Sequence, residues 1–524
     1  MKKTGFILPL LALSAFIAQC ACEEPPVKPA ESDRKTAVSR DGAVEFAIVG
    51  DDQHPLPCRI HVKDHLANPR YPLQLRHWAD HFVCPGKAEL RLPADDYTFE
   101  IERGPEYARE SGTLRLRAGE TQRIERRLKR TADLATKGWY SGDLHVHRPI
   151  EQVPLLMQAE DLHVVPVITW WNNENIWKNR RPPTDLLTRL DGDRFFHVMA
   201  GEDEREGGAL LYFGLAQPLA IAGSGREYPS PMRFVAEARQ HPEVWIDIEK
   251  PFWWDVPVCL ASGRIDSMGL ANNHMCRNRM YETEAWGKPR DAARLPPPRG
   301  NGYWSQEIYY HVLNCGLRVP PSAGSASGVL PNPVGYNRVY VHIGREMTYE
   351  RWWQGLKAGC SFVTNGPLLL VRANEQLPGY VFTASEGTKV VIRVQVELVS
   401  ADRVKALEVV TDGRVTETVS PEQLASGRPV TITFASSGWF LVRAIADVPH
   451  TFRFASTAPY YVEIGRSKRT IRRSSVQFFL DWLDERTQRV PQTLHDPAQL
   501  EEVLQHHRRA KQFWQALLAD ANAE

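Results

Sequence analysis

The hydrophobic pattern of this chain changes its period twice, and these changes restrict the possible folds more than any other feature. From about residue 43 to residue 128, short segments such as AVEFAIV and AELRLP alternate apolar and polar residues between Asp, Pro and Gly turns. A period of two is typical of strands with one buried face. The pattern predicts a small antiparallel β-sandwich over residues 43–130, with no obvious catalytic residue.

The middle of the chain has a different pattern. Short apolar runs at 164–169, 195–202 and 244–251 are separated by stretches long enough for helices, and each run ends in polar residues. Strands with such spacers favour parallel pairing in an α/β layer or barrel. In these folds, functional sites form where the carboxyl ends of the strands meet.

The period of two returns after Pro367 and predicts a second β-sandwich over residues 376–466. A helical tail follows, in which Asp496 and Pro497 form an N-cap and first-turn pair and residues 476–486 form a shorter amphipathic helix. A chain of 524 residues exceeds what one core organises. We therefore expect a multidomain α/β plus all-β protein. Its predicted parts are a leader (1–22), a linker (23–42), a β-sandwich (43–130), an α/β domain (137–375), a second β-sandwich (376–466) and C-terminal helices (467–524).

The first residues are typical of an export signal. Lys2 and Lys3 precede an apolar run over residues 6–18 that is too short to span a membrane. Cleavage near residues 18–22 would release a protein that is periplasmic, secreted or associated with the outer surface of a bacterium. A lipid anchor at Cys20 is the alternative, although Gln19 is an unusual residue before a lipid-modified cysteine. No transmembrane span is expected.

Charge and cysteine content narrow the possible partners. Lys plus Arg number 64 against 63 Asp plus Glu, so the sequence predicts no nucleic-acid partner and favours a small molecule, glycan or peptide. There is no Cys-x-x-Cys pair. In an oxidising compartment Cys58 and Cys84 either bridge or, like the remaining cysteines, are buried as small apolar side chains.

The segment Asp143-Leu-His145-Val-His147 carries the strongest chemical signal. Residues two apart in a strand point to the same face, so Asp143, His145 and His147 can project together toward one cation. A lone His-x-His motif is weak evidence for a metal site, because histidines also lie in hydrophobic cores. The preceding Gly142-Asp143 and the acidic and His residues further along the chain favour the metal interpretation.

This segment resembles the first motif of the PHP (polymerase and histidinol phosphatase) family of metal-dependent hydrolases. The wider run from Gly138 to His147, GWYSGDLHVH, is more similar to the exported branch related to carbaryl hydrolase, the CehA/McbA-like proteins. The resemblance covers most of the chain. It implies a PHP-like (β/α) barrel-type domain over residues 137–375, flanked by the two β-sandwiches.

The family's positions are matched only in part. His145 and His147 fit the first motif, and Gly201-Glu202 fits the element that supplies a bridging carboxylate. The second motif, normally Thr-Asp-His, falls at residues 169–172, where two polar residues are replaced by Trp170 and Trp171. Lys250-Pro251 stands for the usual His-Pro, and residues 324–328 (GSASG) lack the usual Asp and His. The resemblance therefore implies a reduced metal site.

We expect one cation, or two, drawn from zinc, manganese or iron. The predicted ligands are His145, His147, Glu202 and His274, with Asp143 either ligating or orienting an imidazole from behind. Glu249 is a further oxygen donor. Such a cation would activate a water toward an ester, amide, carbamate or phosphoester, with Glu249 or Glu204 taking the proton.

Other side chains near these positions have two interpretations each. Lys250 either stabilises a substrate oxyanion or forms an ordinary surface ion pair. Trp170, Trp171 and Trp254 either stack on a flat ligand or fill the space of lost metal ligands. Arg338 either binds an anionic substrate group or forms a structural ion pair.

Two functions are thus open. The first is an exported metal-dependent hydrolase. The second is a catalytically reduced relative that binds a glycan or peptide through a Trp-lined cleft. The lost second and last motifs count against the first.

Overall fold

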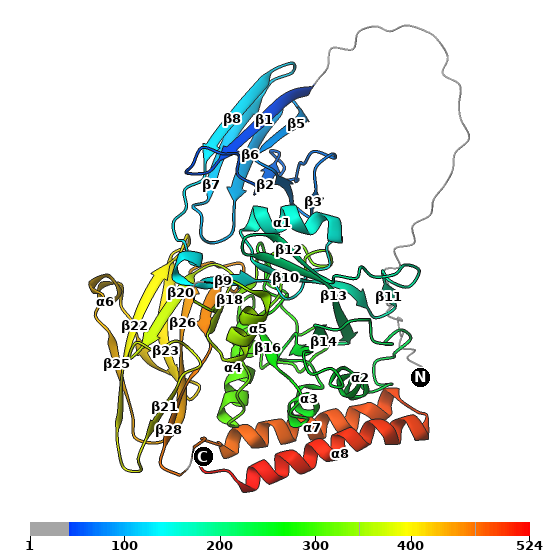
Figure 1. Ribbon diagram of the computed structural model, residues 1–524, viewed down its shortest axis with the longest axis vertical. Helices are drawn as coiled ribbons and strands as arrows, with labels where there is room; N and C mark the ends of the chain where they lie inside the picture. The colour runs from blue at the N-terminus through cyan, green and yellow to red at the C-terminus, as the bar shows by residue number, and fades with distance from the viewer. Residues whose placement is uncertain (1–40, 345, 467) are drawn as a thin grey trace, which may run out of the picture.

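The computed structural model describes residues 41–344, 346–466 and 468–524 (Figure 1). The predicted leader, most of the linker and the lipid-anchor candidate Cys20 lie outside these residues. In the part described, the chain forms several sheets, a set of helices beside the central strands and a pair of long C-terminal helices. The expectation of a multidomain α/β plus all-β protein is confirmed at this level.

The N-terminal part consists of two sheets around one core. Its strands are β1 (Asp41–Val49), β2 (Cys58–Lys63), β3 (His77–Trp78), β4 (His81–Cys84), β5 (Lys87–Pro93), β6 (Asp95–Glu102), β7 (Glu110–Leu116) and β8 (Thr121–Arg127). One sheet has the order β5-β1-β8 and the other β3-β4-β2-β6-β7. The alternate apolar residues of β1 are buried, and Phe46 packs edge-on against Phe82 and Phe99. The predicted antiparallel pattern fails at one pair, because β1 and β8 run parallel.

Cys58 and Cys84 lie directly opposite each other in the antiparallel pair β2–β4. Both are buried, and both are free thiols in this structure. The register thus brings together the two cysteines for which a bridge was one of two alternatives.

The central part mixes strands and helices. Its elements are η1 (Ala135–Lys137), β9 (Trp139–Gly142), η2 (Ile150–Gln152), α1 (Val153–Glu160), β10 (Val164–Trp171), β11 (Glu174–Asn175), β12 (Leu187–Asp191), β13 (Arg194–Arg205), β14 (Gly208–Phe213), α2 (Pro231–Ala238), β15 (Trp245–Ile248), α3 (Val256–Ala261), β16 (Ser267–Ala271), α4 (Gly300–Asn314), β17 (Pro321–Ala323), β18 (Arg338–His342), α5 (Tyr349–Lys357) and β19 (Ser361–Thr364). The three apolar runs predicted as strands lie in β10, β13 and β15.

The expected parallel pairing holds for only some of these strands. β10 pairs with β13 in parallel, as do β15 with β16 and β16 with β17. β13, β14 and β15 run antiparallel, because a tight turn at Gly207, which has a φ of 90°, folds β14 back onto β13. Glycine adopts this left-handed backbone without steric cost.

The C-terminal part is mostly sheet. Its elements are β20 (Leu368–Ala373), β21 (Val381–Ala384), β22 (Val390–Val399), β23 (Val404–Thr411), β24 (Arg414–Thr418), α6 (Pro421–Ser426), β25 (Val430–Phe434), β26 (Gly438–Ala446), β27 (Phe454–Thr457) and β28 (Tyr460–Ile464). β20, β22 and β25 form one sheet. The others continue into the central part, because β27 pairs with β19 and β19 with β18.

Two helices end the chain and lie side by side against the central part (Figure 1). They are α7 (Arg473–Thr493), longer than the predicted segment, and α8 (Pro497–Ala519). The predicted N-cap is confirmed, since the Asp496 side chain accepts a hydrogen bond from Gln499 N. Phe479 stacks on Trp514 with 4.8 Å between ring centroids, which joins the two helices. Within the described residues, none of the helices combines the length and apolar character needed to cross a membrane.

Candidate metal centre

The segment of residues 143–147 follows β9 and is held on both sides by backbone hydrogen bonds. On one side Asp143 N donates to Val164 O and Ile168 N to Val146 O, at 3.1 and 2.8 Å. On the other side Leu144 N donates to Ala323 O and His147 N to Ser327 O, at 3.1 and 2.8 Å. The segment therefore runs between β10 and the chain that follows β17, with a bend at Leu144. The His145 and His147 side chains meet, whereas the Asp143 side chain turns onto the backbone.

Asp143 fixes this segment from behind. Its Oδ1 accepts hydrogen bonds from His145 N and Ser325 N, both at 3.0 Å, and its Oδ2 accepts one from Gly335 N at 2.6 Å. Both carboxylate oxygens are thus engaged by backbone N–H groups. Of its two predicted roles, ligand and positioning residue, the structure supports only a positioning role, exerted through the backbone rather than through an imidazole.

His145, His147 and Glu202 meet at one point. His145 Nε2 lies 3.0 Å from His147 Nε2 and 3.3 Å from Glu202 Oε2, and His147 Nε2 lies 3.0 Å from the same oxygen. Glu202 comes from β13, whose backbone runs parallel to β10 beside this segment. Burial alone raises the pKa of Glu202, but the two imidazoles outweigh it and hold that pKa well below its usual range.

The geometry of this group fits a bound metal ion. Three ligand atoms held at about 2.1 Å around a tetrahedral cation are about 3.4 Å apart, close to the three separations seen here. Two imidazole nitrogens and a carboxylate oxygen are a donor set that suits zinc, manganese and iron. If both Nε2 atoms donated to Glu202, their protons would face each other across 3.0 Å. A shared cation removes that repulsion.

Glu249 and Lys250 lie behind His145. Glu249 Oε1 is 3.6 Å from His145 Nδ1, and its Oε2 is 2.7 Å from Lys250 Nζ. The 3.6 Å separation is too long for a hydrogen bond, so Glu249 acts on the His145 ring through its charge. Burial alone lowers the pKa of Lys250, but Glu249, Glu204 and Glu202 outweigh it and raise that pKa. Lys250 is only 5% exposed, which excludes the alternative of a surface lysine.

Glu204 and Trp171 lie on the more open side of the centre. Glu204 is exposed, and its Oε2 accepts a hydrogen bond from Asn172 Nδ2 at 3.3 Å. The Trp171 ring meets the His147 ring edge-on, with centroids 4.9 Å apart. Trp171 is half-buried, so part of its surface remains available to a ligand.

Trp170 and Trp254 do not line an accessible cleft. Trp170 is buried against Tyr212, with 6.0 Å between ring centroids, and against the backbone of Gly201. Trp254 is buried too, and its Nε1 donates to Trp286 O at 2.6 Å. The prediction that they bind a substrate is therefore wrong in this conformation, and the alternative that tryptophans fill the interior holds for both.

Arg338 and His274 also depart from their predicted roles. Buried Arg338 donates to Gly335 O through Nε and to Glu160 O through Nη1, so the structural alternative holds. His274 follows β16 and interacts with Lys250 and Glu249, but its ring packs between Phe252 and Tyr281. It is not part of the group whose ligand atoms lie within 4.8 Å of one another. The predicted fourth ligand is therefore not brought to the centre.

The centre is almost closed to solvent. The side chains of His145 and His147 are each 2% exposed and that of Glu202 is 5% exposed. The three ligand atoms are therefore shielded from bulk solvent.

Small residues behind the histidines were not predicted as part of the site. A Cβ on Gly324 would lie 2.4 Å from the Cβ of His145, and a Cβ on Gly328 would lie 3.0 Å from that of His147. The GSASG run, which lacks the family's usual ligands, therefore lets the backbone pass close behind the two imidazoles. In the sequence, only the repeated small residues of this run indicate such a close approach.

A second histidine–carboxylate group lies in the N-terminal sheets, and hydrogen bonding alone accounts for it. His61 and His81 place their Nδ1 atoms 3.3 and 3.4 Å from Asp80 Oδ1. Arg59 Nε donates to His61 Nε2 at 3.1 Å, so the ring proton of His61 is on Nδ1. That proton would have to leave for the nitrogen to bind a metal.

Comparison with known proteins adds little. No family model matches the sequence, and no curated protein matches it. A solved structure, the TIE protein of Bacillus anthracis, shares 16% identity over 21% of this chain and 20% of its own, with a TM-score of 0.14. The match spans about a fifth of either chain and bears on neither fold nor function.

Proposed function

We propose that this chain is an exported, metal-dependent hydrolase of the PHP type, with one divalent cation held by His145, His147 and Glu202. The observation that carries the proposal is the convergence of two Nε2 atoms and one carboxylate oxygen within 3.0–3.3 Å. The arrangement agrees with the resemblance of GWYSGDLHVH to the CehA/McbA-like branch. Zinc, manganese and iron remain the candidate metals.

The backbone around the centre supports a barrel-type central domain. Residues 143–147 bond to β10 on one side and to the chain after β17 on the other. Together with the pairings from β10 through β13, β14, β15 and β16 to β17, these bonds can complete a ring of strands. Lys250 and His274 come just after β15 and β16, as expected where sites form at strand ends.

The residues around the cation have separate tasks in this proposal. When bound, the cation lowers the pKa of a water and polarises a substrate oxygen. Glu249 lies beside His145 Nδ1 and is not free to act as base, because it is paired with Lys250. The exposed Glu204 carboxylate takes the proton, held in place by Asn172. Lys250 adds positive charge on the side of Glu249, which favours a substrate that develops negative charge.

The candidate substrates are small or medium esters, amides, carbamates and phosphoesters. Trp171 offers an aromatic wall beside His147, which suits a substrate with a flat group. The closely balanced charges of the chain favour such ligands over a polyanion.

A second candidate function is metal-supported binding of a glycan or peptide without turnover. The observation that favours it is the closure of the centre, whose histidine side chains are each 2% exposed. A cation enclosed in this way can stabilise the fold without meeting a substrate.

Turnover on a panel of p-nitrophenyl esters and phosphates separates the two functions. The hydrolase proposal predicts activity that a chelator removes and that one added divalent metal restores. Glu204→Gln should lower kcat by about a hundredfold or more, as expected for a general base. Glu206→Gln, an exposed neighbour that faces Arg226, is the matched control and should leave kcat unchanged. Metal-loaded protein without turnover on the whole panel would contradict the hydrolase proposal.

Lys250 has its own test. Lys250→Ala should lower kcat more than it changes KM, since its charge is needed where negative charge develops. Unchanged kinetics in a folded variant would remove Lys250 from the mechanism.

A further inference from the structure

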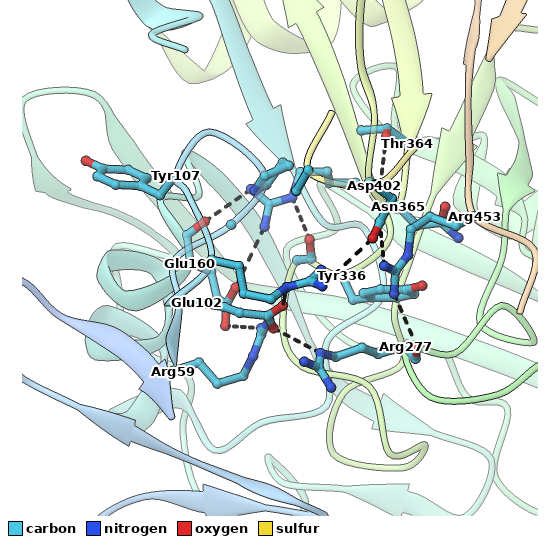
Figure 2. Close-up of a pocket in the computed structure, with 17 residues that line it drawn as sticks. Arg59, Glu102, Tyr107, Glu160, Arg277, Tyr336, Thr364, Asn365, Asp402 and Arg453 are labelled. Atoms are coloured by element: carbon cyan, nitrogen blue, oxygen red, sulfur yellow. Dashed lines mark hydrogen bonds and ion pairs between the residues drawn. The ribbon is translucent and has the colours of Figure 1, made fainter. Parts of the chain in front are cut away.

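A second buried site lies where the N-terminal, central and C-terminal parts of the chain meet (Figure 2). It is a cavity of about 70 Å³, enough for a few water molecules or one small polyatomic anion. Five arginines line it: Arg59, Arg109, Arg277, Arg338 and Arg453. None of them belongs to the proposed metal centre.

The lining of this cavity holds fewer carboxylates than arginines. Glu102, Glu160 and Asp402 are its acidic residues, so five cations face three anions within the lining. Outside the lining, Glu100 contacts Arg277, and the charge of Asp80 acts on Arg59 and Arg277. Burying an uncompensated charge is costly, so a site of this kind gains stability from an additional anion.

The hydrogen bonds leave donors available. Arg453 donates from Nη1 to Asp402 Oδ2 at 2.6 Å, whereas its buried Nε has no hydrogen-bond partner among the described residues. Arg277 donates from Nε to Glu102 Oε2 at 2.9 Å. Burial, with smaller contributions from the charges of Arg59 and Arg453, lowers the pKa of Arg277 to about 10.

We propose that this cavity binds a small oxyanion, a phosphate, sulfate or carboxylate group, held by Arg277, Arg453 and Arg109 at the junction of the three parts. Planar guanidinium groups match the oxygens of such anions in paired hydrogen bonds. The anion supplies the missing negative charge and joins residues from all three parts of the chain. The inference does not depend on the proposed hydrolase function.

The cavity is connected to the metal centre through one loop. Gly335 lies in the cavity wall, and its N–H donates to Asp143, which fixes the backbone of His145. Arg338 in turn donates to Gly335 O. An anion bound against this loop therefore restrains the backbone that positions the metal ligands.

Calorimetric titration of the purified full chain tests the proposal. Inorganic phosphate, sulfate and acetate are titrated separately at equal ionic strength, with chloride as the baseline, and the three arms distinguish the class of oxyanion. We expect one saturable site for at least one of them, and a rise in Tm that grows with the logarithm of its concentration.

Two cavity variants and two controls locate the site. Arg277→Gln and the more tolerant Arg109→Gln, whose side chain is 34% exposed, should each weaken binding about tenfold or more. Arg318→Gln, 31% exposed and paired with Glu463 elsewhere, should bind as the parent does. Because phosphate also binds divalent cations, His147→Ala must retain the affinity. No saturable binding of any of the three anions, unchanged affinity in both cavity variants, or loss of binding in His147→Ala would overturn the proposal.

Discussion

Replacing Asp143 by Asn tests whether this residue is a metal ligand or a support for the backbone. The carboxylate receives three backbone N–H groups, from His145, Ser325 and Gly335, at 3.0, 3.0 and 2.6 Å. The Asn side chain has the same shape but only one acceptor oxygen. If that oxygen keeps the first two bonds, the new NH₂ group faces the N–H of Gly335.

The expected cost follows from these contacts. A hydrogen bond to a charged acceptor is worth about 1.5–3 kcal/mol, and a buried donor left unsatisfied costs about 1–3 kcal/mol. Because these terms overlap, we expect Asp143→Asn to destabilise the central part by about 2–4 kcal/mol. Loss of a group that supports a ligand from behind lowers metal affinity by about 10–100-fold, less than loss of a ligand.

Two measurements on the same variant check these values. Denaturant unfolding of the metal-free chain gives the stability, and competition with a chromophoric chelator gives the metal affinity. Ser325→Ala is the comparison variant, since it removes a hydroxyl group that contacts Asn337 and Asp143 but leaves the backbone N–H on Asp143. We expect it to lower stability without changing the metal affinity.

The supporting role of Asp143 is refuted by either of two results. Full stability together with loss of metal as complete as in His147→Ala would make Asp143 a ligand. Unchanged stability and unchanged affinity would mean that the three backbone contacts do not hold the segment.

Three further predictions concern the fold around the centre. In denaturant unfolding, Gly201→Ala should destabilise the chain by about 3 kcal/mol or more, since its Cβ would lie 1.9 Å from Cε2 of the rigid Trp170 ring. Gly225→Ala should be nearly neutral, because the nearest atom to its Cβ would lie 3.5 Å away. Arg486→Met should lower the free energy of unfolding by about 3–5 kcal/mol, because buried Glu227 and Asp255 lose their shared cation. Arg508→Met on the exposed surface should lower it by less than about 1 kcal/mol. Equal unfolding midpoints for the two variants would contradict this prediction. Burial and the charge of Asp161 raise the pKa of Glu106 to about 7, so the folded chain retains a proton that the unfolded chain has released above its ordinary pKa. This contribution to stability is complete below about pH 4.5 and is lost as the pH rises toward 7. Glu106→Gln should therefore flatten the fall in Tm over that range. Parallel pH profiles of Tm for parent and variant would refute this role of Glu106.

The three side chains of the proposed metal centre were all predicted from the sequence. His145 and His147 lie two residues apart, and Glu202 was predicted from the resemblance of Gly201-Glu202 to the PHP element that supplies a bridging carboxylate. His274 also follows a strand, but position along the chain does not set the direction of a side chain. Its ring packs between Phe252 and Tyr281, contacts that no pattern near residue 274 indicates.

The adjacent tryptophans Trp170 and Trp171 were predicted to share one role, but strand geometry separates them. Neighbouring residues of a strand point to opposite faces, so Trp170 and Trp171 cannot both face a ligand. Trp170 faces Gly201 in the core, and Trp171 faces His147. The sequence also indicates the hairpin from β13 to β14, since Glu206-Gly207 is a two-residue connection that contains a glycine, as is common in hairpins.

The arginine cavity had no signal in the sequence. Arg59, Arg277 and Arg453 are separated by more than a hundred residues along the chain and come from three parts of the fold. Each one alone is an ordinary arginine. Only the packing of the three parts brings five arginines to one cavity.

The metal content of the purified chain tests the central claim most directly. Elemental analysis after extensive dialysis should give about one divalent transition metal per chain, and folded His147→Ala and Glu202→Gln should contain almost none. His274→Gln is the matched control and should retain the metal, because that imidazole lies outside the ligand group. Parent protein without bound metal, or variants of His147 and Glu202 that keep the parent's metal, would contradict the account.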